Sequence, residues 1–259
     1  MTVHEALAEG RLSDAIALQE ETVAAAPTDP VARRFLVDLL AFAGRLDDAR
    51  VQLTHIHSDA PEWHDVERGL HRLFRAERRR SEELRQPQIR PEPAPRHATR
   101  RWLAMKAIHR GKPDDAVRCI DAADNVSPEI RGFLDGQEFT GLRDADDRFG
   151  SVLEAFLGGE YFWFTWESIR KITISAPAVL LDQLYRPAML SLKDGSIFVV
   201  HLPMLYPGSH RADGAFSLGF ETDHICPDGG PTRCIGGKLL LIGDEDEIPL
   251  STCQMIEIR

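Results

Sequence analysis

The stretch Gly10–Ala15, GRLSDA, returns 34 residues later as GRLDDA at Gly44–Ala49. A looser copy, GKPDDA, stands at Gly111–Ala116, 67 residues after the second copy and one residue short of two further periods. A period of 34 residues is the length of the tetratricopeptide helix–turn–helix unit. In such units glycine occupies the turn between paired helices, and aspartate opens the second helix near its positive end. We therefore predict helical hairpins that turn at Gly10, Gly44 and Gly111, and repeats of this kind usually bind other proteins.

The length and composition limit the classes of protein to which the chain can belong. A chain of 259 residues can form one large domain or two ordinary ones. No apolar stretch approaches the roughly 20 residues that cross a bilayer, and the N-terminus lacks the basic and apolar regions of a secretory signal. Four cysteines do not make a disulfide framework. We expect a cytoplasmic protein without a membrane partner.

Charge is distributed unevenly along the chain. Residues 1–65 carry 5 basic and 12 acidic side chains, residues 66–118 carry 15 and 7, and the remaining residues carry 11 and 22. A basic middle segment can bind nucleic acid, and Arg68–Arg101 would form that surface. The alternative is a solvated helix over Arg72–Arg85, where glutamates are interleaved with the arginines. Because no aromatic residues are interleaved and the rest of the chain is acidic, we favour the solvated face over a nucleic-acid adaptor.

The periodicity divides the chain in two. Residues 1–125 show helical spacing, and the four prolines of residues 86–97 interrupt the helices as an extended loop without ending the series. Residues 126–259 contain short strand-like runs, including a pair joined by the turn dipeptide Asp194-Gly195. One helix is expected over Phe149–Leu157. The predicted fold is α+β, with a tetratricopeptide-like helical domain at 1–125 and an antiparallel, strand-rich α+β domain at 126–259.

Motifs for enzymatic chemistry are weak. The sequence contains neither a Gly-x-x-x-x-Gly-Lys-Ser/Thr loop nor a Gly-x-Gly-x-x-Gly fingerprint. Ser209 follows Gly208, but His210 stands where a nucleophile elbow requires a second glycine, so a surface turn is the better interpretation. An enzyme whose pocket lies around Asp144, Tyr206 and His210 stays open as an alternative to a binding protein.

Metal ligands are also poorly spaced. His224, Cys226 and Cys234, with His201 or His210 as a fourth ligand, are the candidates. A His-x-Cys pair followed by a cysteine eight residues later matches no usual zinc spacing. We therefore expect no cofactor and keep these residues only as weak metal candidates.

Two further segments have structural and functional interpretations. Asp144, Asp146 and Arg148 begin a run that resembles a calcium loop, but its sixth and twelfth positions are unsuitable, so we predict a helix N-terminus capped by carboxylates. Arg148 can pair with one of those carboxylates. In the aromatic run of residues 161–166, alternation along a strand sends some rings into the core and exposes others. Because exposed aromatic residues anchor interfaces, Trp163, Trp166 and, separately, Tyr206 are candidate partner-binding residues.

Several of these pieces occur together and in order in one family. The chain resembles the ImpE family, also called TagJ or SciE-type proteins, which are accessory components of bacterial type VI secretion. The segments that carry the resemblance are Ala26–Pro30, Asp135–Phe139, Asp144–Gly150, Val152–Ala155, Gly159–Trp163 and Tyr206–Ser209. The resemblance departs from the family pattern at Thr165, where a proline is usual, and in the cysteine-bearing loop 226–234.

The resemblance implies a non-enzymatic adaptor. Members of the family bind the N-terminal helix of the small subunit of the contractile sheath, and they are linked to the AAA+ ATPase that recycles the sheath. The residue pattern agrees, because helical repeats offer grooves that accept an amphipathic helix. The family supplies no catalytic residues to assign.

Overall fold

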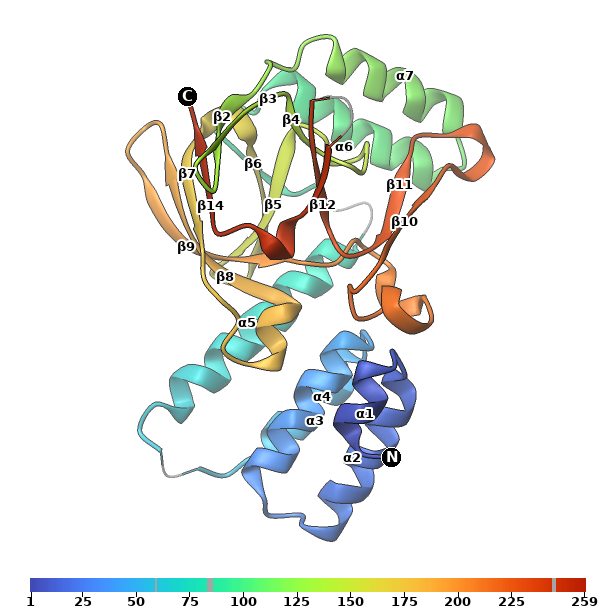
Figure 1. Ribbon diagram of the computed structural model, residues 1–259, viewed down its shortest axis with the longest axis vertical. Helices are drawn as coiled ribbons and strands as arrows, with labels where there is room; N and C mark the ends of the chain where they lie inside the picture. The colour runs from blue at the N-terminus through green and yellow to red at the C-terminus, as the bar shows by residue number, and fades with distance from the viewer. Residues whose placement is uncertain (59, 83–85, 244–245) are drawn as a thin grey trace.

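The computed structural model describes residues 1–58, 60–82, 86–243 and 246–259. Figure 1 shows a group of helices at one end of an elongated molecule and a strand-rich body at the other. The architecture is a mixed α+β fold, with tetratricopeptide-like helices first and sheets after them, so the predicted fold class is confirmed.

The N-terminal helices form two antiparallel hairpins. These helices are α1 (Val3–Ala8), α2 (Leu12–Ala25), α3 (Pro30–Phe42) and α4 (Leu46–Thr54), and the long helix α5 (Trp63–Ser81) follows them. Asp29 caps α3, because its side chain accepts hydrogen bonds from the backbone N–H groups of Val31 and Ala32. Gly10 and Gly44 lie in the hairpin turns with φ values of +75° and +69°. Glycine is suited to these positions because other residues are strained at positive φ.

Both repeated turns lie against the strand-rich body. A Cβ atom at Gly10 would lie 3.0 Å from the backbone carbon of Gly214, and one at Gly44 would lie 2.6 Å from Cδ2 of His210. The contacted segment contains the short helices η3 (Ser209–Arg211) and η4 (Gly214–Phe216), drawn in orange in Figure 1. Gly10 and Gly44 therefore have two roles. Each allows the hairpin to turn, and each lets the helices lie close to the strand-rich body.

The turn glycines allow a matched stability test. Gly111 also has a positive φ, +66°, but around its Cβ position the described residues place no non-neighbouring atom within 4 Å. We expect Gly111→Ala to lower the free energy of unfolding by roughly 1–2 kcal/mol through backbone strain. Gly44→Ala should cost at least about 1 kcal/mol more, because the ring of His210 must also move. Equal losses in urea denaturation would show that the contact with His210 is unimportant.

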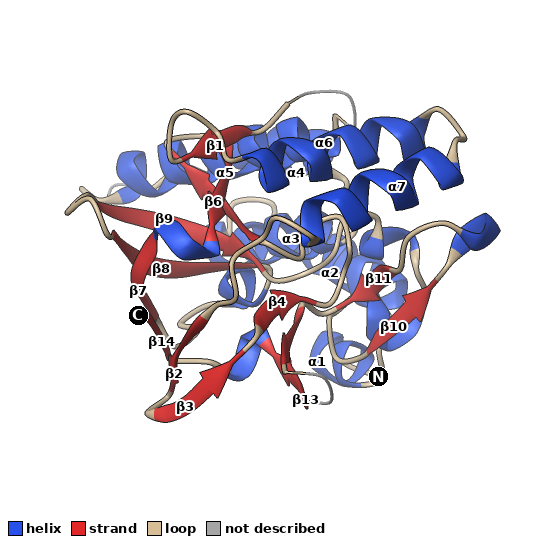
Figure 2. Cartoon of the chain, turned by 90° about the horizontal axis from the view of Figure 1, so that it is seen from above, coloured by secondary structure: helices blue, strands red, loops and turns tan. Residues whose placement is uncertain are grey.

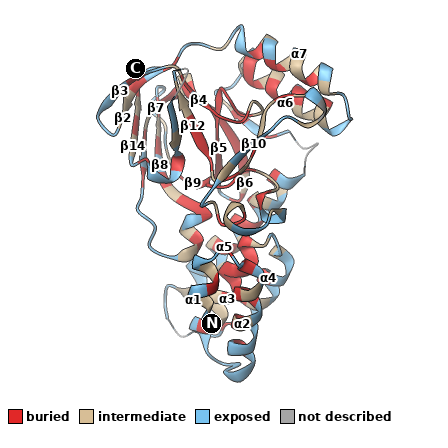
Figure 3. Cartoon of the chain, turned by 45° about the vertical axis from the view of Figure 1, so that its right-hand side comes forward, coloured by how far each residue is buried: buried red, intermediate tan, exposed pale blue. Residues whose placement is uncertain are grey.

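The third hairpin does not extend the helical array. Helices α6 (Arg96–His109) and α7 (Pro113–Asp124) pair with each other, but Figures 1 and 3 show them beside the sheet, at the far end from α1–α4. Ser151 fixes α6 there, because its hydroxyl accepts a hydrogen bond from Arg101 Nε at 2.7 Å and contacts His97 Nδ1 at 2.8 Å. The expectation that the series continues after the Pro-rich loop is corrected, because the third hairpin packs beside the sheet and not on the first two. The division at residues 125 and 126 remains a proposal based on composition.

The strand-rich body contains a nine-stranded sheet in the order β1-β6-β5-β9-β8-β7-β14-β2-β3. Its strands are β1 (Gln88–Arg90), β2 (Arg131–Leu134), β3 (Gln137–Thr140), β5 (Val152–Leu157), β6 (Glu160–Thr165), β7 (Ile169–Ile174), β8 (Tyr185–Leu192), β9 (Ile197–Pro203) and β14 (Met255–Ile258). Its described pairings are antiparallel except that of β1 with β6, which is parallel. Figure 2 shows α5 and α6 near β1 and β6, at one end of the sheet. The Asp194-Gly195 turn joins β8 and β9, as the dipeptide predicts.

Two smaller sheets complete the body. One contains β4 (Leu142–Asp144), β12 (Leu239–Ile242) and β13 (Asp246–Pro249), and the other is the hairpin of β10 (Thr222–Ile225) and β11 (Arg233–Gly236). The first of them covers one face of the large sheet, where Leu240 and Leu142 join the buried cluster of Leu190 and Val200.

The predicted helix over Phe149–Leu157 is instead strand β5, with buried residues at positions 152–156. A strand that is covered on both faces is apolar at successive positions, so its alternation is lost and its spacing also fits a helix. The run from Asp144 to Gly150 is therefore a tight turn between β4 and β5, not a helix N-terminus.

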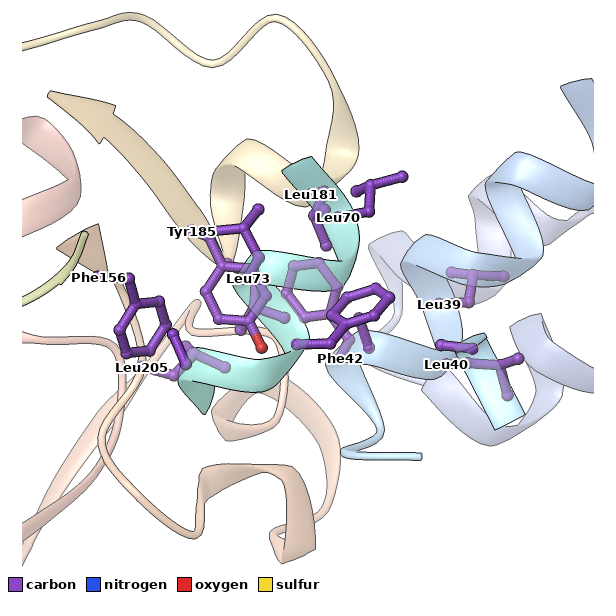
Figure 4. Close-up of a cluster of buried hydrophobic side chains, with 14 of the residues drawn as sticks. Leu39, Leu40, Phe42, Leu70, Leu73, Phe156, Leu181, Tyr185 and Leu205 are labelled. Atoms are coloured by element: carbon purple, nitrogen blue, oxygen red, sulfur yellow. The ribbon is translucent and has the colours of Figure 1, made fainter. Parts of the chain in front are cut away.

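The repeat helices and α5 share a hydrophobic cluster with the strand-rich body. Phe42 of α3 and Leu73 of α5 belong to the same buried cluster as Phe156, Tyr185 and Leu205 of the strand-rich body. Figure 4 shows these side chains converging from both parts, and Figure 3 shows the buried residues continuing through the junction. The repeat helices are thus fixed to the sheet and not tethered by a linker.

Candidate functional site

A cleft of about 400 Å³ opens where the repeat helices meet the strand-rich body. Gly44 and Arg45 line it from the α3–α4 turn, Arg80 lines it from α5, and Tyr206 and His210 line it from the segment after β9. Two of the three residues of the alternative enzyme pocket therefore lie at this cleft.

A buried ion network lies behind the cleft. The carboxylate of Glu154 on β5 accepts hydrogen bonds from Arg80 Nε at 2.8 Å and Arg80 Nη2 at 2.9 Å. Lys238 Nζ lies 2.8 Å from the same carboxylate and 2.9 Å from the carboxylate of Asp144. Tyr206 Oη donates to Asp144 at 2.8 Å and accepts from the backbone N–H of Leu239 at 3.1 Å. We call Arg80, Asp144, Glu154, Tyr206 and Lys238 the buried ion network. It joins α5 to β5 of the nine-stranded sheet and to β4 of the three-stranded sheet.

Burial and charge set the protonation states in this network. Burial would raise the pKa of Glu154, but the positive charges of Arg80 and Lys238 outweigh it and hold that pKa far below its usual value. Burial raises the pKa of Asp144 in spite of the charge of Lys238. Burial and the neighbouring Asp144 carboxylate raise the pKa of the Tyr206 phenol, so this hydroxyl keeps its proton.

This geometry does not resemble an acid–base site. Asp144 and Tyr206 are in contact, but the carboxylate is only 4% exposed and its second oxygen accepts from Lys238. Burial lowers the pKa of His210, which lies at the cleft. The buried hydroxyl of Ser209 donates to the backbone oxygen of Tyr206 at 2.8 Å and accepts from the N–H of Gly236 at 2.8 Å. Ser209 therefore stabilises the turn after Gly208, whose φ is +95°.

The aromatic candidates for partner binding are interior residues. Trp163, Trp166 and Tyr206 are 0%, 1% and 1% exposed. The indole N–H of Trp163 donates to Tyr161 Oη at 2.5 Å, and that of Trp166 donates to the backbone oxygen of Gly150 at 3.2 Å. The expectation that they are exposed is corrected. For Trp163 the reason is that β6 is covered on both faces, so alternation exposes none of its last five side chains. Trp166 begins the short helix η1 (Trp166–Ser168) and Tyr206 follows β9, and both are buried where they lie.

Asp146 connects the turn after β4 to the β10–β11 hairpin. Its carboxylate accepts from Arg148 Nη2 at 2.6 Å and from the backbone N–H of Cys234 at 2.9 Å. Asp146 is fully buried, so this pair organises the turn from within. The pairing of Arg148 with a carboxylate was expected, but the helix that the carboxylates were to cap is absent from the described residues around it.

Three of the metal candidates lie on or within the β10–β11 hairpin, whereas His201 lies on β9 and His210 lies in η3. His224 and Cys234 are opposite each other in register, with 3.8 Å between Nδ1 and Sγ, whereas Cys226 is exposed and its Sγ lies 3.6 Å from Thr232 Oγ1. Burial raises the pKa of the Cys234 thiol, which disfavours the thiolate that metals bind. Within the ranges that the structure describes, no three His, Cys, Asp or Glu side chains are grouped to hold a metal ion.

Most of the described basic residues of the middle segment 66–118 are half-buried or exposed, as the interpretation of a solvated face predicts. Two arginines are buried: Arg80, which lies in the helix expected to be solvated, is 6% exposed, and Arg101, outside that helix, is 3% exposed. The interpretation of a solvated face is therefore wrong for Arg80. Arg101 pairs with Asp124, Arg79 pairs with Glu160, and Arg78 lies 3.6 Å from Asp47. Carboxylates from the acidic segments before and after the middle segment thus neutralise part of the positive charge on which the nucleic-acid alternative rests.

Sequence reasoning missed Arg80, Glu154 and Lys238. A usable signal was present, because Glu154 stands inside the apolar run VLEAFL and Lys238 directly precedes LLLI. A single charge within a strand buried on both faces requires an opposite charge in the folded protein. The sequence pattern does not show which residue supplies that opposite charge.

Comparison with known proteins shows the family. A tetratricopeptide-repeat family model matches residues 6–70, and the model of the ImpE protein matches residues 136–257. Over 261 aligned residues the chain is 30% identical to the type VI secretion system accessory component TagJ of Pseudomonas aeruginosa, covering 96% of this chain and 88% of that protein. The chain belongs to the ImpE family.

The fold of this ImpE-family protein also occurs in a solved structure. The crystal structure of protein VPA1032 from Vibrio parahaemolyticus is similar with a TM-score of 0.91 and 24% sequence identity, and the match covers 99% of this chain and 97% of that one. This likeness shows the shared fold, while the Pseudomonas relative places the protein among type VI secretion accessory components. Across the described ranges, none of the helices has the length and apolar character to span a membrane.

Proposed function

We propose that this ImpE-family protein is a non-enzymatic, cytoplasmic adaptor of type VI secretion that binds the N-terminal helix of the small contractile-sheath subunit. Through that contact it modulates recycling of the sheath by the AAA+ ATPase. The observation that carries the proposal is the pair of helical hairpins that turn at Gly10 and Gly44, in a member of a type VI secretion accessory family. Such repeats commonly accept an amphipathic helix.

The buried ion network supports a binding function over catalysis. Its carboxylates are occupied by Arg80 and Lys238, and the phenol of Tyr206 keeps its proton. A general base must be able to take a proton near the working pH. The network is therefore better suited to hold the helices on the sheet than to transfer protons.

Co-purification tests this proposal. The tagged protein is expressed with the full-length small sheath subunit and, separately, with a subunit that lacks its N-terminal helix. We expect the full-length subunit to be retained and the shortened one to be lost. Retention of both forms equally, or of neither, would refute helix binding.

A further inference from the structure

A pocket of about 310 Å³ lies between α5, α6 and the strand-rich body, and it shares part of its lining with the cleft at the repeat helices. Six basic side chains line this pocket, and its described lining includes no aspartate or glutamate. The six are Arg80, His109, Arg148, His210, Arg211 and Arg233. We call this cavity the arginine pocket. Its volume is at the lower end of the range of small-molecule sites.

The carboxylates that pair with two of these arginines do not line the pocket. Arg148 donates to Asp146 from Nε at 2.9 Å and from Nη2 at 2.6 Å, and its Nη1 has no hydrogen-bond partner among the described residues. Arg80 donates to Glu154 from Nε and Nη2, while its Nη1 makes only long contacts with Glu77, at 3.4 and 3.5 Å. Each guanidinium therefore keeps N–H groups beyond those that its carboxylate uses.

Arg211 adds a positive charge on the solvent side of the pocket. Its side chain is exposed, its Nε lies 3.4 Å from His210 Nε2, and no carboxylate of the described residues forms an ion pair with it. Burial and the positive charges of Arg211 and Arg80 lower the pKa of His210. Arg80 acts on this ring although it pairs with Glu154, so a positive potential reaches the pocket. A cavity lined by charge of one sign attracts ions of the opposite sign.

The chemistry of the lining favours phosphate among the possible anions. A phosphate group bound to an organic molecule carries about 1.5 to 2 negative charges at pH 7 and three strong acceptor oxygens. The planar guanidinium donates pairs of hydrogen bonds that match these oxygens. Met105 and Ile108 of α6 supply an apolar part of the wall, and a wall of low polarity strengthens the attraction between charges.

We infer that the arginine pocket binds a small phosphate-bearing anion, held by Arg80, Arg148 and Arg211. These residues belong to α5, to the turn between β4 and β5, and to η3. A bound anion therefore links the helix that follows the repeats to two segments of the strand-rich body. This inference goes beyond the proposed adaptor function and does not depend on it.

Isothermal titration of the full-length chain with pyrophosphate at low ionic strength tests the inference. We expect saturable one-to-one binding. Arg211→Gln should weaken it by about 10-fold, because a charged donor to the phosphate oxygens is lost. Since Arg211 is exposed, this substitution leaves the core intact. Arg170→Gln is the matched control, because Arg170 is an exposed arginine on β7 and should leave the affinity unchanged.

Two further measurements locate the anion and identify its chemistry. His210 lines the pocket, so the NMR signals of its ring protons should shift when pyrophosphate is added, whereas those of the exposed His64 on α5 should not. Citrate carries several carboxylates and no phosphate, and we expect it to bind more weakly than pyrophosphate.

The contrary outcomes are distinct from one another. No binding of pyrophosphate, or equal weakening by both substitutions, would overturn the inference. Binding without a shift of the His210 signals would place the anion outside the arginine pocket. Citrate bound as tightly as pyrophosphate would contradict the assignment to phosphate. None of these outcomes involves the sheath subunit, so a failure here is distinguishable from a failure of the proposed function.

Discussion

Replacing Glu154 with glutamine is expected to lower the free energy of unfolding by about 3 to 5 kcal/mol, because the change leaves buried cations without their counter-ion. Glu154 is 2% exposed and accepts from Arg80 and Lys238 at 2.8–2.9 Å. Asp144 still pairs with Lys238, and Glu77 lies 3.4 Å from Arg80, so part of the charge stays compensated. The loss is nevertheless a large share of the stability of a typical domain. Urea denaturation measures it.

The control for this prediction is Glu257→Gln. Glu257 pairs with Lys171 at 3.2 Å, but the two side chains are 43% and 39% exposed. Such a surface pair contributes less than about 1 kcal/mol. Similar losses for the two variants would contradict the role given to the buried ion network.

The stability difference between wild type and Glu154→Gln should also depend on pH. The folded protein holds the pKa of Glu154 far below 4.5, the usual value that applies in the unfolded chain. A depressed folded pKa contributes stability that is present above the unfolded pKa and is lost as pH falls toward the folded one. The difference between the two proteins should therefore be constant near neutrality and shrink progressively below pH 4.5.

Trp163→Ala is expected to destabilise the protein by about 3 to 5 kcal/mol, as truncation of a buried aromatic residue does. Trp163 is fully buried, its ring meets Phe149 edge-on with 5.9 Å between centroids, and its N–H donates to Tyr161. Tyr161 in turn donates to Glu154, so the indole also supports the buried ion network. Thermal and urea denaturation would measure the loss.

Trp163→Ala also shows whether Trp163 is a core residue or an interface anchor. Phe220→Ala, at a residue that is 58% exposed, is the control and should change stability by less than about 0.5 kcal/mol. If Trp163→Ala were as stable as the wild type and lost only partner binding, Trp163 would be a surface anchor and the described core would be wrong.

Local patterns predicted those parts of the fold that local chemistry determines. The 34-residue period located the turns at Gly10 and Gly44, and Asp194-Gly195 located a β-hairpin. Strand β5 escaped prediction because both of its faces are buried, which removes the alternation that reveals a strand. The position of α6 and α7 also escaped, since hydrogen bonds to Ser151, distant in sequence, fix α6 to the sheet.

The candidate site depends on contacts that no local pattern encodes. Arg80 and Glu154 are 74 residues apart in sequence, and Lys238 and Asp144 are 94 apart. The sequence shows that a charge stands in an apolar run, but only the three-dimensional arrangement supplies its partner.

Calorimetric titration tests the central claim, that this ImpE-family protein is an adaptor for the sheath-subunit helix. The purified full-length chain is titrated with a peptide of the N-terminal helix of its cognate small sheath subunit, and a scrambled peptide of the same composition is the control. We expect saturable one-to-one binding in the micromolar range for the helix and none for the scrambled peptide. No binding of the helix at tens of micromolar, or equal binding of both peptides, would contradict the claim.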